Sequence, residues 1–173
     1  MKFRQTGAAL AAILGIGLLG ACGGSGSEGG TPAADAEPVV LENGLTPQEQ
    51  IEMREAQFKK FGKAFKAMND ELKSSSPDVA AIQAAAATLP VESAGMEDWF
   101  PAGSGPESGV KTDALPAIWE NRADFDEKIA NFKAASDVLV AASATGDLTA
   151  IGDAFGATGG TCKSCHDTYR KED

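Results

Sequence analysis

The sequence predicts an all-α fold, an antiparallel up-down four-helix bundle, on three observations. Over four separate stretches, apolar residues recur at alternating intervals of three and four, which is the pattern of one helix face. Capping residues, prolines and glycines separate these stretches. No stretch of useful length alternates polar and apolar residues as a β-strand does. Four amphipathic helices with two short connections and one long one fit such a bundle.

The first helix is expected to begin after Thr46, with Pro47 in its first turn and Glu49 at the third position of a capping box. The Ser-Ser-Ser-Pro segment at 74–77 is expected to end it. The core-facing stripe of this helix consists of Ile51, Arg54, Phe58, Phe61, Phe65, Met68 and Leu72. Arg54 is its one charged side chain.

The second helix is expected to start at Val79, and Pro90 is predicted to end it. Residues 91–112 are rich in Gly and Pro and predict a long connection. The aromatic side chains of Trp99 and Phe100 are expected to anchor this connection to the bundle.

The third helix is expected to begin near Leu115-Pro116 and to end before a turn at Gly146-Asp147. The fourth is expected over 148–169. Three glycines, Gly156, Gly159 and Gly160, weaken it. They indicate either a broken start to this helix or a close approach of its backbone to a bound group. The stripe of this helix consists of Leu148, Ile151, Phe155, Thr158, Cys162, Cys165 and Tyr169.

The most specific motif is the Cys-Lys-Ser-Cys-His segment at 162–166, a C-x-x-C-H pattern typical of covalent c-type haem attachment. The two thiols add to the haem vinyl groups, and the imidazole ligates the iron. On a helix, Cys162, Cys165 and His166 project from one face. Because the cysteines lie on the apolar stripe, one covalent haem c is expected in the bundle core near the C-terminal helix.

Two alternatives exist for this motif. A redox dithiol is typical of a βαβ context near the start of a domain, unlike this C-terminal pair. A structural zinc site takes about four Cys or His ligands. Once Cys22 is assigned to a lipid, the chain offers two Cys and one His. Haem is favoured because the only His directly follows the second Cys.

Residues 1–21 are typical of an export signal, with a basic start and an apolar run shorter than the roughly 20 residues of a membrane span. The segment 19–22 resembles the lipobox of bacterial lipoproteins, in which cleavage leaves a lipid on the Cys, here Cys22. An ordinary secretory signal is the alternative. The expected location is therefore the periplasm, anchored to a membrane through Cys22. Gly23 favours the outer membrane, since Asp there favours retention at the inner one.

Residues 22–44 are predicted to be a lipidated Cys followed by a flexible linker with a reach of roughly 26 Å. Residues 45–173 are the size of one domain. Removing residues 1–21 takes away Lys2 and Arg4 and leaves 13 basic residues against 25 acidic ones, a net charge of −12. Such a charge excludes nucleic acid as a partner, because its backbone binds basic surfaces.

Residues 45–173 as a whole resemble cytochrome c′, which is itself a standard example of the up-down bundle. The resemblance rests on five segments. These are Arg54 to Lys59, Lys66 to Met68, Phe100 to Gly103, Ala117 to Trp119 and Gly159 to Arg170.

The resemblance implies that His166 ligates the iron on one side and that a side chain of the first helix faces the other side. In the family, this residue lies four positions after the first-helix Arg, and low-spin relatives carry a Met ligand there. Here it is Phe58, which cannot coordinate iron. Met68 lies roughly 15 Å further along the helix. The expectation is a five-coordinate, high-spin iron with a crowded, apolar distal face.

The resemblance also implies roles for three charged residues. Arg54 would bind a haem propionate, because a buried Arg requires an anion. A surface-reaching Arg paired with an acid is the alternative. Many relatives carry Gln after this Arg, but Glu55 cannot donate a hydrogen bond to a propionate when ionised. Arg170 resembles the family's proximal Arg, with an exposed helix-terminal Arg as the alternative.

These features favour a non-enzymatic haem protein that binds NO or CO, discriminates against O2 and captures NO in the periplasm. A periplasmic electron carrier with an unidentified redox partner is the alternative. A peroxidase is disfavoured because no distal His or second acid-base group is evident. Dimers are common in the family, so a homodimer stays open, although the lysines at 59, 60 and 63 offer no apolar patch for one.

Overall fold

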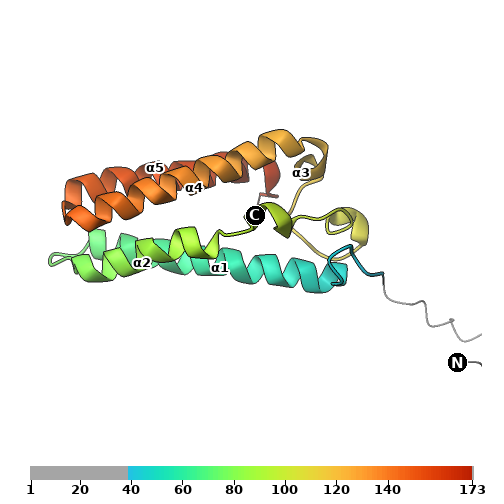
Figure 1. Cartoon of the computed structure of the whole chain (residues 1–173), viewed down its shortest axis with the longest axis horizontal. Helices are drawn as coiled ribbons and strands as arrows, with labels where there is room; N and C mark the ends of the chain where they lie inside the picture. The colour runs from blue at the N-terminus through green and yellow to red at the C-terminus, as the bar shows by residue number, and fades with distance from the viewer. Residues whose placement is uncertain (1–38, 173) are drawn as a thin grey trace, which may run out of the picture. The chain divides into compact units, whose positions relative to one another are not determined.

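The computed structural model describes residues 39–172, and four long helices make up most of that part of the chain (Figure 1). α1 spans Pro47–Leu72, α2 Val79–Glu92, α4 Arg122–Thr145 and α5 Leu148–Tyr169. A short α3 (Ala117–Glu120) and two 3-10 helices, η1 (Met96–Trp99) and η2 (Pro106–Ser108), lie between α2 and α4. The predicted all-α antiparallel bundle is confirmed. The predicted signal peptide, Cys22 and linker residues 23–38 lie outside the described residues.

The four long helices form two antiparallel pairs, α1 with α2 and α4 with α5 (Figure 1). α2 also packs against α4 and so joins the pairs. Met68, Ile82, Leu139 and Ile151, one from each long helix, are fully buried where these helices meet. Burying each such side chain contributes about 1.5–3 kcal/mol. This contact between pairs fixes the distance across which α1 and α5 face each other.

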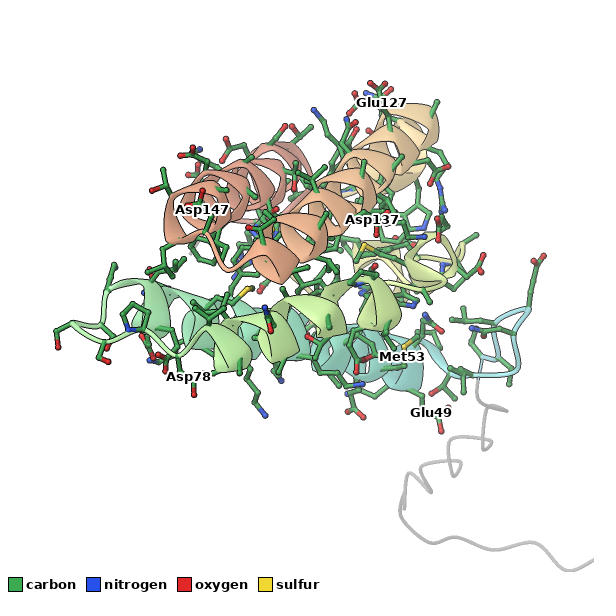
Figure 2. The ribbon with its side chains drawn as sticks, turned by 60° about the vertical axis from the view of Figure 1, so that its left-hand side comes forward. Glu49, Met53, Asp78, Glu127, Asp137 and Asp147 are labelled. Atoms are coloured by element: carbon green, nitrogen blue, oxygen red, sulfur yellow. The ribbon has the colours of Figure 1, made fainter. Side chains whose placement is uncertain are left out.

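Side-chain caps begin three of these helices. Thr46 and Glu49 form the expected capping box at the start of α1. Asp78 accepts hydrogen bonds from the first-turn amides of α2, and Asp147 does the same for α5. Figure 2 shows Asp78 and Asp147 at the same end of the bundle. Each cap contributes about 1 kcal/mol.

The prediction that Pro90 ends the second helix is wrong, because α2 continues to Glu92. Proline lacks an N–H and therefore removes one hydrogen bond, but here only two helical residues follow it. The backbone N–H of Ser93 then bonds to the carbonyl of Leu89 at 3.0 Å and closes the helix. A proline in the last turn thus weakens α2 without stopping it.

The third helix was also predicted as one piece from near Leu115, and this is wrong. Asn121, with φ −125° and ψ 46°, separates α3 from α4. The break lies between two side chains that reach the same carbonyl. Trp119 donates from Nε1 to the oxygen of Phe100 at 3.2 Å, and Arg122 donates from Nη1 to that oxygen at 3.3 Å. These contacts hold the long connection against the start of α4.

The long connection is anchored as the sequence predicts, since both Trp99 and Phe100 are buried. Gly105 passes so close to Trp119 that an added Cβ would lie 2.8 Å from its ring. Only glycine therefore fits at that position without a shift.

Arg54 ties this connection to α1. Its Nη1 donates to Ser104 Oγ at 3.0 Å, and its Nη2 donates to Thr112 Oγ1 at 2.8 Å. Its guanidinium carbon lies 4.8 Å from the centre of the Phe100 ring. The buried Arg54 side chain on α1 thus contacts three residues of the connection: Phe100, Ser104 and Thr112.

In the structure the connection between α2 and α3 continues to Pro116, and its last residues hold the end of α5. The backbone N–H of Leu115 bonds to the carbonyl of Tyr169 at 3.0 Å, and that of Lys171 bonds to the carbonyl of Asp113 at 2.7 Å. The segment that carries the Cys and His residues is therefore fixed relative to the Arg54 contacts. Within residues 39–172, no helix has the length and apolar character needed to cross a membrane.

We predict that Thr112→Val lowers the free energy of unfolding by about 1–3 kcal/mol, because the isosteric change leaves the buried Arg54 guanidinium without one acceptor. Thr168→Val, at an exposed position of α5, is the matched control and should change stability by less than about 0.5 kcal/mol. Urea denaturation followed by circular dichroism measures both. Equal stability of the two variants would contradict this role of Thr112.

Candidate functional site

A cavity of about 750 Å³ lies in the bundle. α1, the long connection, α4 and α5 each supply part of its wall. Aromatic and aliphatic side chains dominate the lining, and charged groups join them. The volume is that of a site for a small molecule or cofactor. The aromatic lining residues are Phe58, Phe61, Phe65, Phe100, Phe125, Phe132 and Tyr169.

Cys162, Cys165 and His166 all line this cavity from α5. α5 is an unbroken helix through the motif, so the i, i+3, i+4 spacing places the three side chains on one face, as predicted. Both cysteines are free thiols and pack partly buried against the core. Two thiols and one imidazole therefore border the same space.

The environment of the thiols disfavours a redox dithiol. Burial raises the pKa of Cys162, and burial followed by the Cys162 thiol raises the pKa of Cys165 to about 11. Dithiol catalysts work through a lowered pKa, because the thiolate is the nucleophile. Among residues 39–172, no group of three or more His, Cys, Asp and Glu side chains is placed to hold a metal ion. That part of the chain therefore offers no ligand set for the zinc alternative.

Although His166 is an exposed residue, partial desolvation at the cavity wall is the main influence on its pKa. It lowers the pKa of the imidazole, the positive charge of Arg170 lowers it further, and Asp167 acts in the opposite direction. The neutral imidazole, which is the form that ligates metals, is favoured as a result. Arg170 also lines the cavity, and its Nη2 lies 3.9 Å from Asp113 Oδ2.

Phe58 is a wall residue on the α1 side of the cavity. Its side chain is held by edge-to-face contact with Trp99, with ring centroids 5.6 Å apart, and with Phe61 at 5.9 Å. Phe58 is nevertheless 36% exposed, more than any other aromatic residue of the α1 stripe. A large apolar ring is therefore fixed at a wall of the cavity rather than packed into the core.

Arg54 borders the cavity and is only 3% exposed. No ion pair among residues 39–172 includes it; its bonds go to the Ser104 and Thr112 hydroxyls. Burial lowers its pKa to about 10, although Glu55 and Glu107 oppose that change. A buried cation without a carboxylate partner is costly, so this wall suits an anionic group. The alternative of a surface-reaching Arg54 is thus contradicted by its burial.

Glu55 also lines the cavity, but its side chain is half exposed and lies 3.9 Å from Lys59 Nζ. The structure therefore brings all seven predicted residues of the folded domain to one cavity. The residues are Arg54, Glu55, Phe58, Cys162, Cys165, His166 and Arg170. Cys22 lies outside the described residues.

Some lining residues were missed by the sequence analysis. Met96 is the most important, because it places a buried thioether in the cavity wall. It lies in η1 within the long connection, where no periodic pattern marks a buried position. Thr112 and Lys111 were missed for the same reason. Only the fold, which places them on the wall of the same cavity as the predicted residues, reveals them.

The glycines of α5 leave the helix intact, which excludes the alternative of a broken start. Gly159 lines the cavity, and an added Cβ there would lie 4.0 Å from Phe65, an ordinary contact. Gly156 and Gly160 have open space around them. Hydrogen bonds along α5 and its packing on α4 hold the helix across these residues.

Comparison with known proteins assigns the family. A protein-family model described as Cytochrome C' matches residues 49–170. A cytochrome c-556 of Agrobacterium fabrum is 36% identical over 122 residues, which cover 70% of this chain and 80% of that protein.

Two solved structures are similar over the same region. One is a nitric oxide complex of a cytochrome c′ variant from Alcaligenes xylosoxidans, with a TM-score of 0.66, 33% identity and coverage of 73% of this chain and 97% of the other. The second is a cytochrome c′ with ligand-controlled dimer dissociation, with a TM-score of 0.69, 32% identity and coverage of 75% and 99%. The chain therefore belongs to the cytochrome c′ family, whose members are non-enzymatic haem proteins.

Proposed function

We propose that the chain carries one covalent haem c attached through Cys162 and Cys165, that His166 is its only protein ligand to iron, and that it binds NO or CO while discriminating against O2. The observation that carries this proposal is the phenyl ring of Phe58 in the cavity wall. Low-spin proteins that resemble this chain have a Met ligand at that position.

The residues present fit a haem. The cavity offers two thiols for thioether bonds and a neutral imidazole for the iron. Arg54 offers a buried cation for a propionate, and this anion would offset the cost of burying its charge. Thr112 holds the guanidinium at the wall through its hydroxyl. Arg170 adds a second positive charge beside His166.

When bound, the haem would supply an iron that can take a diatomic ligand, and His166 would be the residue that holds this iron. Phe58 and Phe61 present only carbon and hydrogen to the cavity, so neither donates a hydrogen bond to a diatomic ligand. The polarity and donors of the distal pocket decide whether O2 binds. NO and CO depend less on such donors, and a relative from Alcaligenes xylosoxidans has been solved as its NO complex.

Electron transfer is the second candidate function, and Met96 is the observation that favours it. A thioether bound to iron would give a six-coordinate carrier site, as in cytochromes with Met and His ligands. Met96 is buried in the cavity wall. In that case the protein would exchange electrons with an unidentified redox partner instead of binding a gas.

The proposed location is the periplasm, with a lipid on Cys22 that anchors the domain to a membrane. The support is the export signal of residues 1–21 and the lipobox that ends at Cys22. Capture of NO as it crosses the envelope is the role that this location and this ligand class suggest.

The first prediction concerns the ferrous holoprotein. Its absorption and resonance Raman spectra should be those of five-coordinate, high-spin iron, CO and NO should change them, and air should give no stable oxygen complex. Phe58→Met should produce a six-coordinate, low-spin spectrum that resists CO, because a thioether then occupies the distal wall. Phe58→Leu is the matched control and should remain high-spin.

A low-spin wild-type spectrum that CO leaves unchanged would contradict gas binding. The variant Met96→Leu would then show whether the sulfur of Met96 is the second ligand to the iron. Conversion of such a spectrum to high-spin by Met96→Leu would identify Met96 as the ligand and favour the electron carrier.

The second prediction follows from the lowered pKa of His166. A group whose pKa is lowered on folding contributes stability above its ordinary pKa, and this contribution is lost as the pH falls through the lowered value. The His166 signature in the ferric spectrum should thus persist from pH 8 to below the ordinary value of about 6.5. Arg170→Gln should raise the midpoint of acid loss, because a positive charge beside His166 is removed.

Lys73→Gln, at an exposed position beyond the end of α1, makes the same change of charge and should leave the midpoint in place. A wild-type midpoint above about 6.5 would show that burial does not govern this imidazole.

The third prediction concerns the anchor. Full-length protein expressed in a bacterial host should incorporate a labelled fatty acid and sediment with membranes. Cys22→Ser should lose the label and enter the soluble periplasmic fraction, whereas Ser25→Ala should behave like wild type. Soluble, unlabelled wild-type protein would refute lipidation and leave an ordinary secretory signal.

A further inference from the structure

Tyr169 is an oxidisable side chain in the cavity to which the gas-binding proposal gives no role. It is 2% exposed and lines the cavity. It lies one helical turn after Cys165, on the same face of α5. It is also the only tyrosine among the 173 residues. A group attached at Cys165 would therefore have this phenol as a neighbour.

The phenol has a proton acceptor in place. Tyr169 donates its hydroxyl hydrogen to Asp124 Oδ2 on α4. Its ring packs edge-to-face on Phe125, with centroids 5.1 Å apart. The Tyr169 ring is buried, whereas Asp124 is exposed, so a proton that reaches this carboxylate can pass to solvent.

The pair has the chemistry of a one-electron donor. A phenol that loses an electron becomes strongly acidic, and a positive charge retained in a buried place is costly. Transfer of the phenolic proton to Asp124 avoids that charge and leaves a neutral radical. A buried tyrosine without such an acceptor would be much harder to oxidise.

We propose that Tyr169 is a redox-active residue that gives one electron to the haem and its phenolic proton to Asp124 when a hydroperoxide oxidises the holoprotein. The proposal rests on the covalent haem proposed above but not on selectivity among gases.

The electrons and atoms balance as follows. Cleavage of the hydroperoxide O–O bond to an alcohol and water, or to two waters for hydrogen peroxide, takes two electrons and two protons. The haem centre would supply both electrons, water from the solvent would supply both protons, and Tyr169 would return one electron to the haem. Tyr169 is left as a neutral phenoxyl radical and Asp124 as a carboxylic acid. A one-electron reductant from solution supplies the other electron.

Ring contacts lead from Tyr169 along the cavity wall to Trp119, which does not line the cavity. Phe125 contacts Phe100 at 4.9 Å between centroids, and Phe100 contacts Trp119 at 6.2 Å. Trp119 is only half-buried and is held by bonds to the carbonyls of Phe100 and Pro101. A radical on Tyr169 is therefore connected by a short series of ring contacts to a second oxidisable residue, Trp119.

The test uses the haem-loaded protein, with attachment first verified by its optical spectrum and mass. The ferric protein is mixed with hydrogen peroxide without added reductant, frozen within seconds and examined by electron paramagnetic resonance. We expect an organic radical whose hyperfine splitting narrows when the protein is made with ring-deuterated tyrosine. Because the chain has one tyrosine, this change assigns the radical. A radical unaffected by deuteration would overturn the proposal, as would no radical at all.

Variants then test the proton acceptor. Tyr169→Phe should remove the tyrosyl signal, and Asp124→Asn should lower its yield by about tenfold or more, since the amide cannot accept the proton. Asp137→Asn makes the same charge change on α4 at an exposed position labelled in Figure 2, and should keep the wild-type yield. Equal yields from the two Asn variants would refute the role of Asp124.

The gas-binding proposal and this one fail separately. If the protein forms a tyrosyl radical but does not bind CO, only the gas-binding proposal is contradicted. If it binds CO and NO but forms no tyrosyl radical, only the proposed role of Tyr169 is contradicted.

Discussion

The structure depends on one constraint: two thiols and an imidazole must border a single cavity from one helix, while the facing helix supplies a charge but no ligand. The first half is met by the i, i+3, i+4 spacing on α5, which is fixed at its end by backbone bonds to the long connection. The second half is met by Arg54 and Phe58, one turn apart on α1. Packing of α2 on α4 sets the space between the two walls.

The charge on the α1 wall explains why the connection is long. Arg54 is buried, and its guanidinium donates hydrogen bonds to hydroxyls of the connection rather than to a carboxylate. Hydroxyl partners orient a guanidinium without neutralising it, so the wall keeps its preference for an anion. The same connection holds Trp119 and the end of α5. A shorter link between α2 and α4 would lose these contacts.

Much of this could be predicted from the sequence, because helical periodicity and the C-x-x-C-H spacing are local signals. The seven predicted residues of the cavity all lie there. The predictions that were wrong or missing depend on contacts between residues far apart in the sequence. Pro90 stays inside α2 because a proline in the last turn costs the helix little stability. Asn121 breaks the third helix where the side chains of Trp119 and Arg122 both donate hydrogen bonds to the carbonyl of Phe100. Met96 and Thr112 come from an aperiodic segment, where only packing brings them to the wall.

We propose that His166 would be the one protein ligand to the iron and that the Phe58 ring would face the haem from the opposite wall. A crystal structure of the reduced, haem-loaded protein, at a resolution that shows bonds to iron, tests this arrangement. We expect thioether bonds to Cys162 and Cys165, one protein bond to iron from His166, and the Phe58 ring facing the other side. A second protein atom bonded to iron, with the Met96 sulfur as the foremost candidate, would contradict it.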